Sequence, residues 1–340
     1  MKQLIGILFT LFTLAPGLSS QTTPTPPDYP SAAAINEIQQ ALYNDQYDRA
    51  ITLCSLVIES QPASPSGYSL LAGTMMARMT DREEDLYGEQ FENLIDTTIT
   101  LAEKLMPDLN PQQAAWNSLW LGNAYAYQAL YDARFGSVYN AMKSGMKARD
   151  SFARGVEFDS TNKDLLAGLG SYHYWKSAKA GFLRWIGLFK NEKDRGQKEL
   201  LEAYEFGLVY SESARRAMLW IWLNEEQYDS VVTVAREIWD RYPEGKAVLW
   251  PLAEALTELK RYEESAEVYE ALRERLAVEP GNYFNLIECD YQLCDCYRKL
   301  SQDDNAKRVA AHLDEYDELI PKETRKRQKK KLAWLNRRER

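Results

Sequence analysis

Residues suited to acid–base chemistry are few and scattered in this sequence. His173 stands among aromatic residues in the segment GSYHYWK, and the 340 residues contain only two histidines. Adjacent acids such as Glu83-Glu84 and Glu263-Glu264 are not accompanied by a histidine or serine in a catalytic order, so they are interpreted as solvated helix faces. The sequence therefore predicts a noncatalytic protein, and His173 is expected to be a core residue.

The four cysteines favour buried thiols over a metal site or a disulfide framework. Cys289, Cys294 and Cys296 fall within one expected helix, and Cys54 is far away in sequence. Cys289 and Cys296 share a helix face, but two turns separate them, which is beyond disulfide reach. Zinc sites built from cysteine pairs need a turn between the ligands, which a helix does not provide. No metal and no cofactor is expected.

Nucleotide-binding motifs are also absent from the sequence. A phosphate-cradling GxxxxGK segment does not occur. Gly168-Leu169-Gly170 lacks the third glycine and the preceding strand of a dinucleotide site. These observations leave a binding protein as the more economical interpretation.

The elements that must position these residues follow a repeat. The segments EQYDSVV around Tyr228 and KRYEESA around Tyr262 lie 34 residues apart (262 − 228), each between two apolar segments with helical periodicity. NDQYDRAI around Tyr47 has the same character. A period of this length with this shape is typical of stacked helix-turn-helix repeats.

On these residues the chain resembles the tetratricopeptide repeat (TPR) family. Small residues recur where the two helices of each repeat cross closely, and Cys294 with Ala306 shows the standard spacing of 12. The resemblance implies an all-α, right-handed superhelical solenoid of about seven hairpins over residues 32–320. The corresponding spacing is 26 for Gly122 with Ala148 and for Gly170 with Gly196. Longer helices or an inserted segment are therefore expected in the irregular region 80–210.

The first 31 residues are expected to lie outside the solenoid. Residues 1–20 combine Lys2, an apolar run and small residues, which is typical of a secretory signal peptide cleaved after Ser19 or Ser20. Residues 21–31 form a Pro/Thr-rich linker. The mature protein is therefore predicted to be exported, either periplasmic or secreted.

The C-terminal residues 321–340 are strongly basic. They contain ten Lys or Arg and two Glu, a net charge of +8, so the preceding residues carry −17 (−9 minus 8). The apolar group Leu332-Ala333-Trp334-Leu335 allows this tail to dock as the cap that solenoids need. Contact with anionic lipid headgroups is the alternative. Nucleic acid is not expected as a partner, because the body is acidic and export is predicted.

The apolar segment Phe182–Phe189 (FLRWIGLF) is flanked by lysines. It is interpreted either as an insertion packed on the adjacent repeat or as a wedge for peripheral membrane contact or a lid over a ligand.

The strongest functional expectation comes from the resemblance, which implies that the first helix of each repeat lines a concave groove. Aromatic and arginine side chains are typical of binding hot spots. The residues at the groove positions are Trp116, Asn123, Tyr127, Tyr174, Trp175, Arg216, Trp220, Asn224, Trp250 and Tyr291.

These groove residues predict a cell-envelope scaffold that binds a peptide or another segment of a partner protein. The alternative is a carrier of a hydrophobic small molecule or lipid, with a pocket near Tyr174, Trp175 and Phe182–Phe189. The Lys and Asn set with which some TPR proteins bind a peptide carboxylate is not present at the matching positions.

Overall fold

The computed structural model describes residues 32–179 and 190–336, which form helices and contain no strand. The predicted all-α helical-repeat solenoid is confirmed. The predicted signal peptide, the Pro/Thr-rich linker and the segment Phe182–Phe189 lie outside the described residues.

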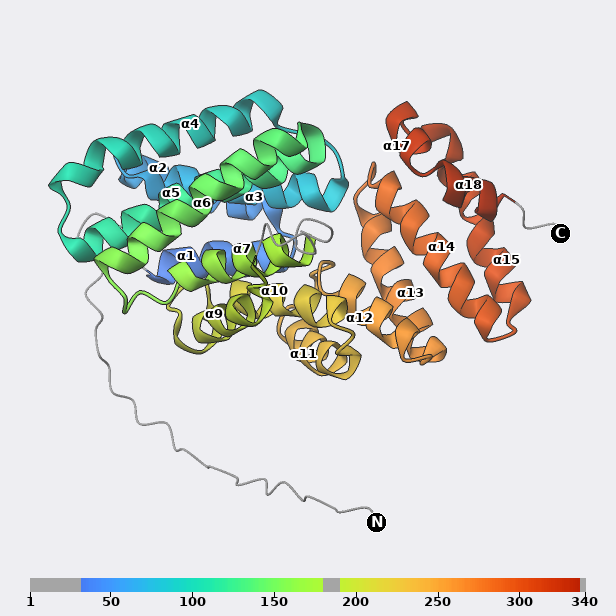
Figure 1. Cartoon of the computed structure of the whole chain (residues 1–340). Coiled ribbons are helices and arrows are strands. Elements are labelled where there is room, and N and C mark those ends of the chain that lie inside the picture. The colour runs from blue at the N-terminus through green and yellow to red at the C-terminus, as the bar shows by residue number, and fades with distance from the viewer. Residues whose placement is uncertain (1–31, 180–189, 337–340) are drawn as a thin grey trace, which may run out of the picture.

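Most of the helices pair into antiparallel hairpins (Figure 1). The hairpins are α1 (Ala32–Tyr43) with α2 (Tyr47–Ser60), α3 (Pro65–Arg82) with α4 (Gly88–Leu105), α5 (Pro111–Phe135) with α6 (Val138–Phe158), α7 (Leu165–Lys179) with α9 (Lys193–Phe206), α10 (Ser211–Asn224) with α11 (Tyr228–Arg241), α12 (Leu249–Glu258) with α13 (Tyr262–Val278), and α14 (Tyr283–Lys299) with α15 (Asp303–Ala311). The short helices α16 (Leu313–Tyr316), α17 (Lys322–Arg327) and α18 (Lys329–Leu335) come after them.

The turn inside four of these hairpins has one recurring geometry. Two residues before each second helix, a residue other than glycine adopts the left-handed conformation, with φ between 57° and 61°. The next backbone N–H donates back to a carbonyl five residues earlier, as in a Schellman turn. The left-handed residues are Asp45, Glu226, Lys260 and Ser301. This turn is the physical basis of the 34-residue period.

The two irregular hairpins reach the same spacing in different ways. In α5–α6 the helices themselves are long, at 25 and 21 residues. In α7–α9 the helices are of ordinary length, and the extra residues lie between Lys179 and Lys193. A Cβ on Gly170 would lie 2.6 Å from the Gly196 carbonyl oxygen, so α7 and α9 cross in backbone contact. This contact explains why the sequence has glycine at both positions.

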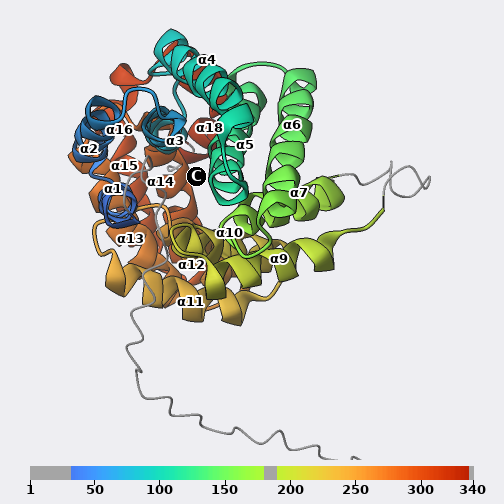
Figure 2. The same ribbon diagram turned by 90° about the vertical axis from the view of Figure 1, so that its left-hand side faces the viewer.

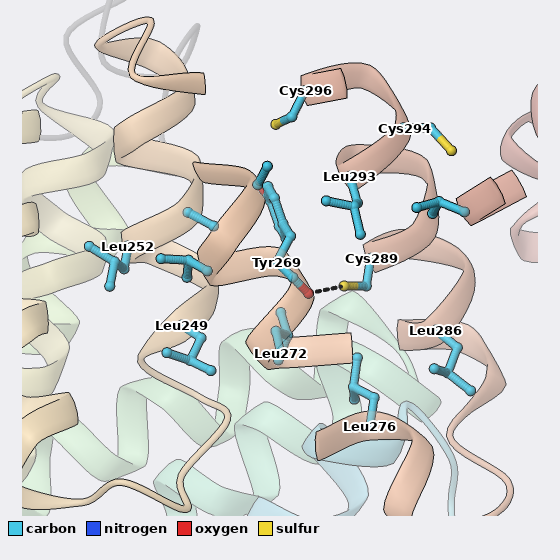
Figure 3. Packing of buried hydrophobic residues seen from close by; sticks show 14 of the residues in the cluster. Leu249, Leu252, Tyr269, Leu272, Leu276, Leu286, Cys289, Leu293, Cys294 and Cys296 are labelled. Atoms are coloured by element: carbon cyan, nitrogen blue, oxygen red, sulfur yellow. Dashed lines mark hydrogen bonds between the residues drawn. The ribbon is translucent and has the colours of Figure 1, made fainter. Parts of the chain in front are cut away.

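The largest part of the core lies between α12, α13 and α14 (Figure 3). Leucines from these helices interdigitate around Tyr269, and the Cys289 thiol donates to the Tyr269 carbonyl over 3.2 Å. All four cysteines are free and buried. Burial raises the pKa of Cys54 and Cys294 to about 12, so these thiols are unreactive packing residues.

The solenoid curves until its two halves meet, so that the helices surround a common axis (Figure 2). The first helices form the inner layer, in which α3, α5, α7, α10 and α12 contact one another in order. Helix α14 then returns to contact α3. We call this junction of the N-terminal and C-terminal hairpins the seam.

A buried lysine joins the two sides of the seam. The Lys246 ammonium lies 3.0 Å from Asp45 Oδ2 and 3.1 Å from Asp81 Oδ2, about 200 residues away in sequence. Burial lowers the pKa of Lys246, but the charges of the two aspartates outweigh it and hold that pKa above its usual value. Burial raises the pKa of Asp81 to about 6 in spite of Lys246. The three charges thus depend on one another.

Polar contacts extend the seam along the end of α3. Glu279 accepts from Arg82 over 2.9 Å and from Arg78 over 3.1 Å. The Asn282 side chain donates to the Asp81 carbonyl over 2.8 Å, capping the C-terminus of α3. A Cβ on Gly245 would lie 2.2 Å from the Tyr43 carbonyl oxygen, so only glycine fits where the chain passes the end of α1.

The basic C-terminal residues dock on α14 and on the seam. Leu332 and Leu335 are buried in the core that α14 contributes to. Lys331 pairs with Glu288, and Arg327 pairs with Glu83 beyond the end of α3. The described part of the tail therefore caps the solenoid, as one of the two interpretations of the sequence expected.

Replacing Lys246 by methionine should destabilise the protein by about 3–5 kcal/mol in urea unfolding at pH 7.5, because two buried carboxylates lose their shared cation. The folded-state pKa of Asp81 is already raised above its unfolded value, and the substitution raises it further. The folded variant then binds a proton that the unfolded chain does not, so its deficit relative to wild type should shrink as the pH falls towards 6.

The matched control is Lys163→Met, which removes an exposed pair with Glu202 at 3.5 Å. It should cost less than about 1 kcal/mol. Equal losses for the two variants would mean that Lys246 does not hold the seam.

Candidate functional site

A cavity of about 670 Å³ lies on the axis that the inner helices surround. Its volume is in the range of roughly 300–1,000 Å³ found for ligand sites in proteins. Aromatic side chains supply much of the wall and come from both halves of the chain: Tyr43, Tyr47, Tyr127, Tyr210, Trp220, Trp250 and Phe284. The same wall contains carboxylates and two arginines. The cavity can hold a ligand that has both apolar and polar groups.

Four of the predicted groove residues line this cavity. Tyr127 comes from α5, Arg216 and Trp220 from α10, and Trp250 from α12. Trp220 is 43% exposed, which is high for a tryptophan beside a core. The repeat register therefore brings side chains from three hairpins to one place.

Two further predicted residues lie within the wall and do not face the cavity. Trp116 packs between two core clusters and stacks on Trp120, with ring centroids 6.2 Å apart. Asn123 is buried and donates to the Tyr210 hydroxyl over 2.9 Å. Both residues support the aromatic surface from behind.

Tyr174, Trp175 and Asn224 form a separate cluster. Tyr174 is fully buried, so its ring is not available to a partner, which corrects the expectation for this residue. Its hydroxyl accepts from the Asn224 side chain and donates to Glu225, each over 2.6 Å. The Trp175 ring meets the Tyr174 ring edge-on at 5.1 Å. These hydrogen bonds fasten the end of α10 to α7.

Tyr291 is covered by the C-terminal helix. Its ring lies 4.7 Å from the Trp334 ring and 5.6 Å from the Lys331 ammonium. The capping of α14 by α18 thus occupies the surface that the sequence assigned to a partner.

Arg216 is the most distinctive charged group in the cavity wall. Its guanidinium lies between the rings of Tyr43 and Tyr242, at 4.2 and 4.9 Å from their centroids. Nε and Nη2 are buried with no hydrogen-bond partner in the described structure, and the Glu212 carboxylate is 3.8 Å away. Burial lowers the pKa of Arg216, which shows how little solvation the charge retains. This cation is poised to interact with an electron-rich or anionic group.

Tyr210 is a cavity residue that the repeat pattern does not reveal, because it precedes α10. Asp164 holds it in place by accepting backbone N–H bonds from Leu208, Val209 and Tyr210 over 2.7–3.1 Å. The Tyr210 hydroxyl is hydrogen-bonded to Tyr127, so the two rings form one polar-edged surface. Buried Asp164 in the loop before α7 is the signal that the sequence offered.

His173 lies in the core, as the sequence predicted, and is paired there. It is 4% exposed, and its Nδ1 is 2.6 Å from the Glu199 carboxylate. No group of three or more His, Cys, Asp or Glu residues in the ranges 32–179 and 190–336 is arranged to hold a metal ion. The same ranges contain no helix long and apolar enough to cross a bilayer.

Asp164→Asn should lower the free energy of unfolding by about 1–3 kcal/mol, because an amide N–H₂ group would face backbone donors that now bind a carboxylate. The measurement is urea unfolding followed by circular dichroism. Asp159→Asn is the control, because Asp159 closes an exposed turn to Thr161. If the Asp164 variant is no less stable than this control, Asp164 does not position the Tyr210 loop.

Comparisons with known proteins point to the same repeat class. No family model matches the chain. The chain is similar to the TPR repeat-containing protein YpiA of Bacillus subtilis (strain 168), with 26% identity over 186 residues. The match covers 55% of this chain and 38% of that relative. The helical-repeat architecture and the partial similarity to a TPR repeat-containing protein therefore agree.

Proposed function

We propose that this protein is a noncatalytic scaffold of the cell envelope that holds a segment of a partner protein in its axial cavity. The observation that carries this proposal is the convergence of Tyr127, Arg216, Trp220 and Trp250 on one cavity. Aromatic and arginine side chains are those that most often dominate binding energy at protein interfaces. The similarity to a TPR repeat-containing protein supports a role in protein–protein interaction.

The seam limits how such a partner enters. Because α14 returns to α3, the inner surface is bounded on all sides of the axis. A long extended segment would have to thread through the ring, whereas a chain end or the tip of a loop can enter along the axis. The partner segment that we propose is therefore a terminus or a loop with an aromatic or apolar residue near its end.

A second candidate is a carrier of a small hydrophobic molecule or lipid. The cavity volume and the lateral closure of the ring favour it, because both limit the size of what can be bound. The pocket is then the axial cavity and not the neighbourhood of Tyr174, which is fully buried.

Removing the two cavity tryptophans should abolish partner capture. We expect Trp220→Ala with Trp250→Ala to lose the proteins that the wild type retains from a cell-envelope extract, by at least tenfold in quantitative mass spectrometry. Ala247→Trp, which adds bulk to the cavity wall, should have the same effect without deleting a core contact.

The matched control for this capture experiment is Tyr204→Ala with Phe206→Ala. It removes two exposed aromatic rings from α9 and should retain the partners. Equal retention by the cavity variants and the control would remove the cavity from the proposal.

Native mass spectrometry of protein isolated from the exported fraction tests the carrier and the export together. A carrier should show a copurified adduct, and the adduct should be missing from Ala247→Trp. A signal peptide predicts a mature mass that begins at Ser20 or Gln21. Repeated absence of an adduct would reject the carrier, and a full-length mass would reject cleavage.

A further inference from the structure

The first half of α6 carries an apolar stripe that no helix covers. Val138, Met142 and Met146 succeed one another at intervals of four residues, so they share a helix face, and Tyr139 lies beside them. Their exposed fractions are 72%, 57% and 47%, and that of Tyr139 is 77%. A run of large apolar side chains this exposed on a folded surface usually marks an interaction site.

This half of α6 contributes nothing to the core. The buried residues of the helix are Ala148, Ser151, Phe152 and Gly155, all of which lie beyond the stripe. Figure 2 shows α6 on the outer side of α5, away from the axial cavity. The stripe is therefore separate from the proposed partner site, and a role for the stripe is independent of any role for the cavity.

The charge around the stripe is opposite to that of the protein. No Asp or Glu occurs from Ala133 to Arg149, a stretch that includes four Lys or Arg, whereas the residues before the basic tail carry a net charge of −17 (−9 minus 8). Lys143 and Lys147 directly follow the two methionines and are exposed. Lys147 lies 4.8 Å from the Tyr125 ring centroid, and no ion pair of Lys143 occurs in the described structure. An apolar stripe bordered by lysines results.

We propose that this face of α6 docks on an anionic phospholipid surface. A single row of four side chains is much smaller than the roughly 800 Å² per partner of a stable protein interface. On a fluid surface the same row suffices, because each apolar side chain enters the boundary between headgroups and acyl chains while the lysines attract anionic headgroups. The stripe on the outside of a long hairpin reaches such a surface without obstruction of the axial cavity.

The experiment is flotation of the full chain with vesicles of phosphatidylcholine alone or with an equal amount of phosphatidylglycerol. The wild type should bind only the anionic vesicles, and less at high salt. Lys143→Gln with Lys147→Gln should weaken binding by about 25-fold, since each lysine near an anionic surface contributes about fivefold. Met142→Glu with Met146→Glu should abolish binding.

Two control variants separate this face from other surfaces. Leu56→Glu with Leu319→Glu makes the same change of charge at exposed leucines of α2 and the region before α17, and it should bind as the wild type does. Lys322→Gln with Lys326→Gln removes two exposed lysines of the tail and should lower binding only slightly.

Three results would overturn the proposal. The first is an absence of wild-type binding at low salt. The second is a loss in either control pair as large as in the α6 variants. The third is self-association, measured by analytical ultracentrifugation, that the methionine variant abolishes while vesicle binding is absent, since the stripe would then serve a second copy of the chain.

Discussion

The architecture depends on a buried cation that joins two ends of a curved chain. Lys246 sits between Asp45 and Asp81, and all three side chains are almost withdrawn from water. Desolvating three charges makes such a cluster a weak source of net stability, but any other alignment of the two edges would leave a charge buried alone. We infer that the cluster selects one register of closure. Gly245 adds a steric condition, because the chain there touches the carbonyl at the end of α1.

The seam and the cavity wall share residues, so closure and binding are linked. Arg216 of α10 lies between Tyr43 of α1 and Tyr242 at the end of α11, and these two rings meet edge-on across the seam at 5.2 Å. A ligand that interacts with this guanidinium also acts on the stack that closes the ring. By linkage, occupancy of the cavity then favours the closed form. A solenoid with separate ends has no such coupling.

The local pattern of the fold was predictable from the sequence, and its closure was not. The 34-residue period arises from a turn that needs one left-handed residue, so Glu226 and Lys260 occupy equivalent places. The same register correctly placed Cys294 and His173 in the core. Closure, by contrast, arises from small rotations accumulated over many hairpins. Nothing in a single repeat indicates that Asp81 will meet Lys246.

The candidate site shows the same division between local and long-range information. The register identified Tyr127, Trp220 and Trp250, because the inner face of a first helix is a local property. It misplaced Tyr291, since the docking of Trp334 depends on a tail with no repeat pattern. It also omitted Tyr210, whose position is set by a long-range hydrogen-bonded loop around Asp164.

The seam also changes what kind of object the chain is during its synthesis. In an open repeat array each hairpin needs only its neighbour, so folding can keep pace with the ribosome. Here the partners of Asp45 and Asp81 are made about 200 residues later. Until then the inner aromatic face of α1 and α3 remains open to other chains. The last step of folding is a ring closure with a large loop entropy, and premature association at that edge is the hazard that the finished molecule no longer shows.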